Sequence, residues 1–326
     1  MDRLPLSDII SIDEVYTNMP ENGKYALVIQ DFYTGDPIDL LRSRTIEVTE
    51  PYFTSIPIDE RKRVKYLLSD MYNPYINFVD KYFPNAIAVV DSFHVIQWML
   101  RLIDNYIRAR LKEMRARDKA EAEKKSLETG REVSIIQSHE VYLLQNYRWL
   151  VLSNQANIKY HTDPRMDRHY RALMNTYDYE YALFSYFPRL QTLRDLKEKY
   201  IIFNSRYIGN PTDATSELDK LISFYASCGD SLFVEFSKTL TTYRDYIINS
   251  FIVVEKHGRG GLYDARLSNG PIESLNRKIK DLKRNGHGYR NFEHFRNRFL
   301  YATRSNPVLD ASNNHQVMYF ASENDE

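Results

Sequence analysis

Strand-like runs are concentrated in the first 91 residues, and this uneven distribution constrains the fold more than any other feature. Apolar and β-branched residues dominate five short runs, at residues 9–16, 24–31, 37–41, 64–70 and 86–91. Turn-forming Pro, Gly and Asn residues separate the first three runs, which predicts a meander of antiparallel hairpins. A helical pattern between the last two runs completes the signature of a mixed α/β sheet with helices on both sides.

A helical block of about 160 residues follows, and we expect no strand between residues 93 and 255. An amphipathic pattern predicts a long helix at 95–117, and the highly charged segment 118–132 predicts an exposed hairpin or linker. Glycines at 258–261 predict a flexible hinge. Further helices are expected at 133–153, 164–184, 190–203, 215–227 and 231–254. The predicted domains are a discontinuous core at 7–95 plus 256–304, an all-α insertion at 96–255 and a tail at 305–326.

The segment 268–284 predicts a helix that carries one acid among many bases. Ser268 or Asn269 can cap it, Pro271 suits its first position, and Glu273 falls in its first turn. Glu273 and Asn276, three residues apart, share one side of the helix. Basic residues occupy much of the remaining surface: Arg277, Lys278, Lys280, Lys283 and Arg284. A solvated helix with a dipole-stabilising glutamate and a functional helix both fit this pattern.

Total charge predicts no partner, because Lys+Arg and Asp+Glu both number 44. Residues 255–304 nevertheless contain 12 Lys/Arg against 5 Asp/Glu, so a polyanion can bind there. The single cysteine excludes an internal disulfide and any multi-cysteine metal site. No signal-peptide pattern and no run of eighteen apolar residues occurs, so we expect no membrane span.

Aspartates stand within or directly after three of the strand-like runs. Asp13 and Glu14 are adjacent in the first run and therefore point to opposite faces of a sheet. Asp70 and Asp91 end later runs, at the edge where open α/β sheets bind ligands. A structural ion pair for Asp13 and a turn cap for Asp70 are the alternatives. Converging carboxylates can instead hold divalent cations for phosphoryl transfer.

Five segments resemble insertion-sequence transposases of the ISL3 family and occur in the order found there. They are residues 12–14, 69–75, 90–95, 269–276 and 280–295. The resemblance implies a DDE transposase with a ribonuclease-H-like core split by a helical insertion. By this resemblance Asp13 and Asp70 are the metal-binding aspartates and Glu273 is the closing acid.

The same resemblance implies two Mg²⁺ ions, which Mn²⁺ can replace, held by Asp13, Asp70 and Glu273. Asp91 and His94 resemble an Asp/Cys-x-x-His motif of related transposases and are expected, with Asn276, to support the site. A competing assignment makes Asp91 the second catalytic acid. Strand order favours Asp70, because the second acid of such folds lies beside the first.

Double-stranded DNA is the expected partner, bound through Arg277, Lys278, Lys280, Lys283 and Arg284 by a homo-oligomer in the prokaryotic cytoplasm. The expected reaction is strand cleavage and strand transfer of an insertion sequence. Full-length relatives begin with a zinc-binding segment and a helix-turn-helix, and neither precedes Asp13 here. We therefore expect a truncated or separately encoded catalytic portion. The alternative is a catalytically inactive, DNA-binding remnant.

Overall fold

The computed structural model describes residues 1–19, 24–258 and 260–307, and the chain forms two compact units. One unit holds residues 1–89, 256–263 and those from 268 onwards. The second holds residues 90–255 and 264–267. Most of the predicted tail at 305–326 and much of the predicted turn at 18–23 lie outside the described residues.

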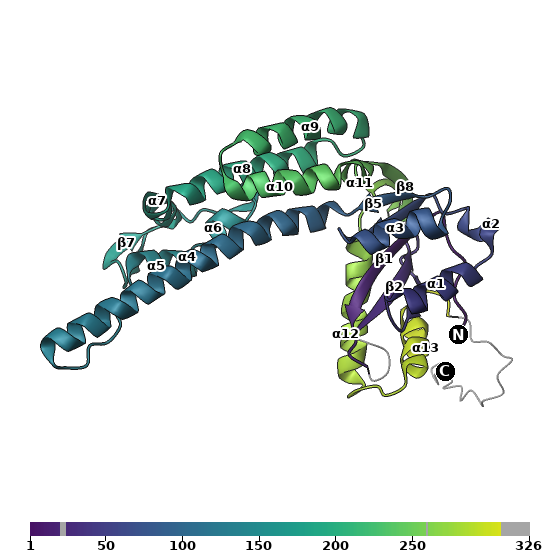
Figure 1. Ribbon diagram of the computed structural model, residues 1–326, viewed down its shortest axis with the longest axis horizontal. Helices are drawn as coiled ribbons and strands as arrows, with labels where there is room; N and C mark the ends of the chain where they lie inside the picture. The colour runs from purple at the N-terminus through teal and green to yellow at the C-terminus, as the bar shows by residue number, and fades with distance from the viewer. Residues whose placement is uncertain (20–23, 259, 308–326) are drawn as a thin grey trace, which may run out of the picture. The chain divides into compact units, whose positions relative to one another are not determined.

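A five-stranded mixed sheet forms the first unit, in the order β3-β2-β1-β4-β5 (Figure 1). Its strands are β1 (Ile9–Tyr16), β2 (Tyr25–Asp31), β3 (Pro37–Leu41), β4 (Tyr66–Ser69) and β5 (Ile87–Val90). β1 pairs antiparallel with β2 and parallel with β4, while β2 pairs antiparallel with β3. The predicted mixed α/β sheet flanked by helices is confirmed, and β1 lies at its centre.

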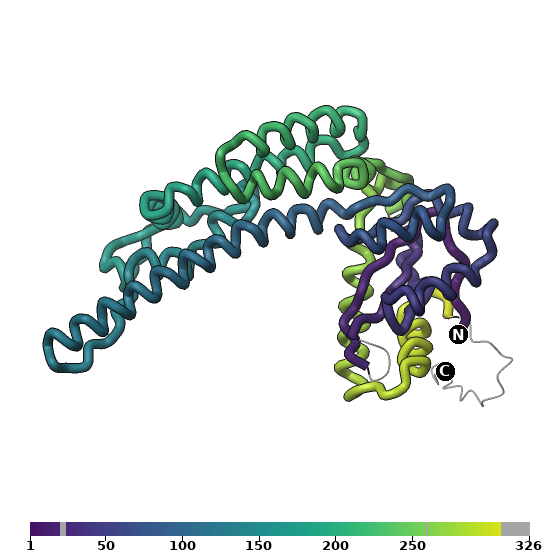
Figure 2. Tube along the Cα trace, in the orientation of Figure 1, coloured from purple at the N-terminus to yellow at the C-terminus, as the bar shows by residue number. Residues whose placement is uncertain are grey.

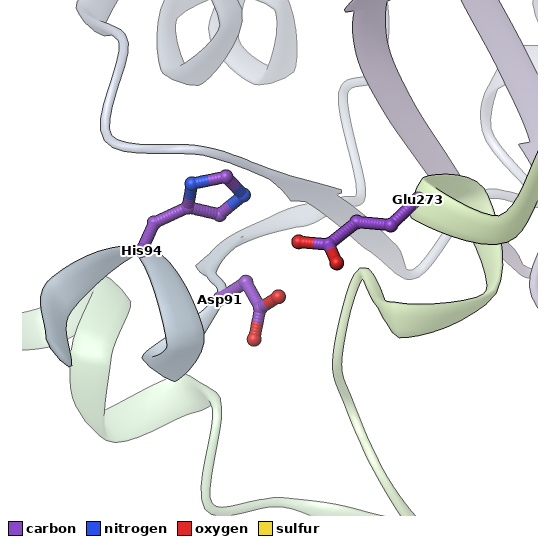
Figure 3. A group of neighbouring side chains, drawn as sticks. All are labelled: Asp91, His94 and Glu273. Atoms are coloured by element: carbon purple, nitrogen blue, oxygen red, sulfur yellow. The ribbon is translucent and has the colours of Figure 1, made fainter. Parts of the chain in front are cut away.

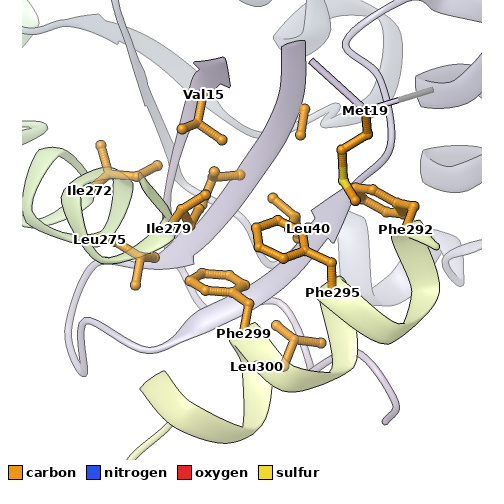
Figure 4. Packing of buried hydrophobic residues seen from close by; sticks show 12 residues of the cluster. Val15, Met19, Leu40, Ile272, Leu275, Ile279, Phe292, Phe295, Phe299 and Leu300 are labelled. Atoms are coloured by element: carbon orange, nitrogen blue, oxygen red, sulfur yellow. The ribbon is translucent and has the colours of Figure 1, made fainter. Parts of the chain in front are cut away.

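Helices cover both faces of this sheet. The helices are α1 (Ile46–Ser55), α2 (Ile58–Arg61), α3 (Asn73–Tyr82), α12 (Gly270–Asn285) and α13 (Phe292–Thr303). α12 and α13 pack on one face of the sheet, against β1, β2 and β3, through an apolar cluster (Figure 4). The cluster includes Val15, Val28, Leu40, Ile279 and Phe299. Aromatic rings of α1 and α3 pack together on the other face of the sheet. The centre of the Phe53 ring lies 5.4 Å from that of Phe78 and 5.0 Å from that of Tyr82. The segment that contains α12 and α13 is therefore part of the core of the sheet unit.

The second unit is mainly helical. Its elements are α4 (Ser92–Thr129), α5 (His139–Asn146), α6 (Trp149–Leu152), η1 (Gln155–Asn157), β6 (Arg165–Asp167), β7 (Ala172–Met174), α7 (Thr176–Tyr186), α8 (Pro188–Arg206), α9 (Pro211–Ser227), α10 (Ser231–Thr242) and α11 (Arg244–Asn249). α4 packs against α5, α6, α8 and α10. None of the helices that the structure describes combines the length and apolar character that crossing a membrane requires.

The predicted linker at 118–132 is wrong for most of its length, because α4 continues without interruption to Thr129 (Figure 2). Opposite charges in this segment recur at four-residue intervals, which stabilises a helix. Lys119 pairs with Glu123, and Glu121 pairs with Lys125. Gly130 then ends the helix in the left-handed conformation, with φ of 66°.

The expectation of no strand between residues 93 and 255 is also wrong. β6 and β7 form a two-stranded sheet within the segment predicted as helix 164–184. Asp167 Oδ1 accepts hydrogen bonds from the backbone N–H groups of His169 and Tyr170, which fixes a turn that competes with the helix. The predicted glycine-rich hinge is replaced by a second two-stranded sheet, β8 (Val253–Gly258) with β9 (Gly261–Arg266).

The α12–α13 cluster predicts a strong dependence of the sheet unit on Phe299, which is fully buried. We expect Phe299→Ala to lower the free energy of unfolding by about 3–5 kcal/mol, because a cavity replaces the ring. Tyr301→Ala, at a ring that is 53% exposed on the same helix, is the control and changes it by about 0.5 kcal/mol or less. Urea titration measures both. Equal effects of the two substitutions would contradict the assignment of α13 to the core.

Candidate active site

Asp13 lies in the central strand β1 and points toward α12. Only 9% of the residue is exposed. Its Oδ2 accepts a hydrogen bond from the side-chain amide of Asn276 at 2.7 Å, and its Oδ1 accepts one from the backbone N–H of Glu14 at 2.7 Å. A buried carboxylate requires such donors. The structure therefore joins residues 13 and 276 directly, as the sequence could not show.

Packing of α12 makes this contact possible. The helix begins after Asn269 with proline in its first turn, as predicted, and Asn269 is fully buried with its Nδ2 3.5 Å from the Ile12 carbonyl. Ile272, Leu275 and Ile279 face the sheet and are buried. Because Asn276 follows Leu275 on the inward side, its amide is carried to the strand along with the apolar residues.

Asp70 directly follows β4, the strand that pairs in parallel with β1. β1 and β4 pair in parallel with Ile9 opposite Tyr66 and Ser11 opposite Leu68. Extending this register by two residues on each chain sets Asp13 opposite Asp70. Neighbouring strands lie about 4.8 Å apart, and opposed residues of parallel strands point to the same face. The second predicted acid thus lies at the carboxyl end of the strand next to the first.

Asp91 and His94 are positioned by the end of β5. Asp91 directly follows the strand, is 2% exposed and caps α4, since its Oδ1 accepts a hydrogen bond from the backbone N–H of Phe93 at 3.2 Å. His94 stands in the first turn of α4, three residues later. The hydrogen bonding of β5 to the sheet therefore fixes where the Asp-x-x-His motif begins.

Asp91 and His94 lie at the start of α4 in the helical unit, and Glu273 lies in the first turn of α12 in the sheet unit (Figure 3). Glu273 is one turn before Asn276, the residue that contacts Asp13. The sequence predicted Glu273 as a metal ligand and gave Asp91 and His94 a supporting role.

Two polar atoms at the site suit a metal centre. Within the described part of the chain, His94 Nε2 and Asn276 Oδ1 are buried and have no hydrogen-bond partner. Buried polar atoms normally find a partner, so each is a candidate to face a ligand. Carboxylate oxygens are the ligands that Mg²⁺ prefers, and one imidazole among them also suits Mn²⁺. The donor set therefore fits a divalent cation of this type.

Basic residues extend from Glu273 along α12. Arg277, Lys280 and Arg284 follow it at steps of four, three and four residues, so they form one stripe about 10 Å long. Arg277, Lys278 and Lys280 are exposed and make no ion pair with any described residue. Lys283 differs, because its ammonium donates to the Thr17 carbonyl and lies 5.7 Å from the centre of the Tyr16 ring.

Glu14 points away from this site, as the alternation of the strand predicted. Its carboxylate pairs with Arg44 and accepts a hydrogen bond from the Tyr75 hydroxyl at 3.0 Å. Burial and the charge of Glu14 raise the pKa of Tyr75, so this hydroxyl stays protonated and remains a donor. Glu14 is thus part of the packing of α3 rather than of the candidate site.

Arg266 is a charged residue in the same unit as Asp91 that the sequence did not indicate, because it follows a glycine-rich segment that predicts a hinge. Burial lowers the pKa of Arg266, while the charges of Tyr200 and Asp91 raise it by a smaller amount. Its guanidinium donates to the Ser250 carbonyl at 2.7 Å and to the Asn204 carbonyl at 3.0 Å. These bonds anchor a positive charge in the same unit as Asp91.

The fold and site together define a mixed α/β protein in which aspartates directly follow the adjacent strands β4 and β5. A family model described as transposase, for the ISL3 group of DDE transposases, matches residues 10–299. The chain therefore belongs to the ISL3 transposase family. No curated protein and no solved structure shows a significant match to the chain.

The Asp91-x-x-His94 motif and the buried, unpartnered Nε2 of His94 predict that His94 contributes to divalent-cation binding. We expect His94→Ala to weaken Mn²⁺ binding by about tenfold or more, in the range found when groups that support a metal site are removed. Calorimetric titration of the full chain with Mn²⁺ measures this. His294→Ala, at an exposed histidine of α13, is the control and leaves the affinity unchanged. Unchanged affinity in both variants would remove His94 from the site.

Proposed function

We propose that this transposase-family chain catalyses metal-dependent cleavage of DNA strands and their transfer to a target, with Asp13, Asp70 and Glu273 as its catalytic acids. The hydrogen bond from Asn276 to Asp13 is the observation that carries the proposal. It fixes α12 against β1, so Glu273 lies one turn away from a residue that contacts the first acid. The β1–β4 register supports the place of Asp70.

Each residue has a distinct part in this proposal. Asp13, Asp70 and Glu273 would hold two Mg²⁺ ions, which Mn²⁺ can replace. These ions supply Lewis acidity that activates water or a 3′-hydroxyl and stabilises the leaving oxygen. Asn276 orients the Asp13 carboxylate, and because an amide carries no charge it leaves the negative charge of Asp13 available to a cation. Asp91 and His94 have a supporting role in the proposal.

Double-stranded DNA, as element end and as target, is the proposed substrate. The stripe of Arg277, Lys280 and Arg284 begins one turn after Glu273, so a phosphate backbone lying along α12 would pass the acids. We expect a homo-oligomer on DNA, because the two ends of an element each need an active site. Such a reaction takes place at the DNA of the prokaryotic cytoplasm.

Asp91 remains a second candidate for the middle acid. The observation in its favour is its place in the chain, since it directly follows β5, the strand beside β4. The register favours Asp70, because continuing the β1–β4 pairing by two residues leads from Ser11 and Leu68 to Asp13 and Asp70. Comparing the two Asp→Asn variants separates the assignments.

The proposal predicts that Asp70→Asn and Glu273→Gln each reduce cleavage by about a thousandfold or more, since a lost metal ligand removes several kcal/mol of transition-state stabilisation. The substrate is a plasmid that carries the coding segment with its flanking DNA, incubated with Mg²⁺ or Mn²⁺. Asp80→Asn, at an exposed acid of α3, is the matched control and retains full activity.

Three outcomes separate the possibilities. Cleavage retained by Asp70→Asn but lost in Asp91→Asn would transfer the role of second acid to Asp91. Cleavage retained by Glu273→Gln would contradict the proposed site. DNA binding by the wild-type chain with no metal-dependent cleavage would identify a DNA-binding remnant.

A further inference from the structure

A basic hollow lies in the helical unit, within the segment 108–148. It encloses about 470 Å³ between α4, the end of α5 and the start of α6. Its lining consists of Arg108, Leu111, Lys112, Arg115, Gln145 and Arg148. Four of these six side chains are cationic, and none is anionic.

The regular geometry of α4 produces this arrangement. Arg108, Lys112 and Arg115 are spaced by four and three residues, so they form one exposed stripe about 10 Å long. Leu111 is buried and forms the apolar floor. Arg148, at the start of α6, adds a fourth cation to the lining.

Few negative charges offset these cations. Arg108 Nε lies 2.6 Å from one oxygen of Asp104, and Arg148 Nη1 lies 3.4 Å from the other. Arg115 donates to the neutral Gln145 side chain at 2.9 Å. Among the described residues, no carboxylate lies within ion-pair distance of Lys112 or Arg115. One carboxylate therefore faces four cations, and their mutual repulsion favours an anionic partner.

The adjacent hollow along α4 shows that this imbalance is local. Its charged lining residues are Arg117, Lys125, Asp118, Glu121 and Glu140. Arg117 pairs with Glu140 at 2.9 Å, and Lys125 pairs with Glu121 at 2.7 Å. Positive charges there are matched within the protein, so that surface offers a polyanion no comparable attraction.

We propose that the hollow at Arg108, Lys112, Arg115 and Arg148 is a second DNA-backbone site, separate from the stripe on α12. The inference rests on the proposed function for the identity of the polyanion. Successive phosphates of one duplex strand advance about 3.4 Å along the axis, so a 10 Å stripe spans about three of them. Guanidinium groups bind phosphate oxygens in pairs, which suits three of the four cations.

The test compares two double variants of the full chain on one long duplex. Lys112→Gln with Arg115→Gln removes two cations that have no carboxylate partner. Lys119→Gln with Lys124→Gln is the matched control, because it removes equal charge from the same helix where each lysine faces a glutamate, at 3.5 and 3.9 Å. Affinity is measured over a range of salt concentrations.

We expect the first pair to weaken binding and to reduce the slope of log affinity against log salt by about 1.8, or about 0.9 for each lost phosphate contact. The control pair leaves the slope unchanged. Equal slopes in wild type and the first pair, or equal losses in the two pairs, would overturn the inference. Thermal unfolding of each variant checks that the fold is intact.

Cleavage assays distinguish this inference from the proposed function. The Lys112→Gln/Arg115→Gln chain should need a higher DNA concentration to reach half of its maximal cleavage rate, because the hollow holds DNA. If the double variant has a smaller salt slope than the wild type but the wild type cleaves no DNA, the second DNA-backbone site is supported and the proposed activity is contradicted. If the double variant has the wild-type salt slope and the wild type cleaves DNA, the second site is contradicted and the proposed activity is supported.

Discussion

The packing of α12 against β1 is the interaction on which the account depends. Ile272, Leu275 and Ile279 bury one side of the helix, and the hydrogen bond from Asn276 to Asp13 fixes its position along the strand. Apolar burial supplies most of the stabilisation, but it is non-directional. The amide–carboxylate bond adds the geometric specificity, because a slide of one helical turn would leave a buried carboxylate without that donor.

Within the sheet unit, two constraints bear on the proposed acids. Parallel pairing of β1 with β4 leads, when continued by two residues, from Ser11 and Leu68 to Asp13 and Asp70. Glu273 is carried by α12, one turn before Asn276. The helical unit contributes charge of its own, since the stripe on α4 from Arg108 to Arg115 has more cations than acids to pair with them.

Local patterns sufficed where structure is local. The five strands follow from alternation and turn residues, and α12 begins with Pro271 in its first turn, although no side-chain capping bond forms there. A dense run of charges predicts a linker at 118–132, but α4 continues because pairs such as Lys119 with Glu123 stabilise the helix. Contacts across the chain, such as Asn276 with Asp13, carry no local signal. Asp91 and His94 are recognisable in the sequence as a motif.

Anomalous diffraction from Mn²⁺-soaked crystals is the most direct measurement of whether the three acids share a metal site. The account predicts Mn²⁺ peaks within about 2 Å of carboxylate oxygens of Asp13, Asp70 and Glu273. Mn²⁺ bound elsewhere, with these carboxylates more than about 10 Å apart, would contradict it, because two ions about 4 Å apart could not then be shared among them.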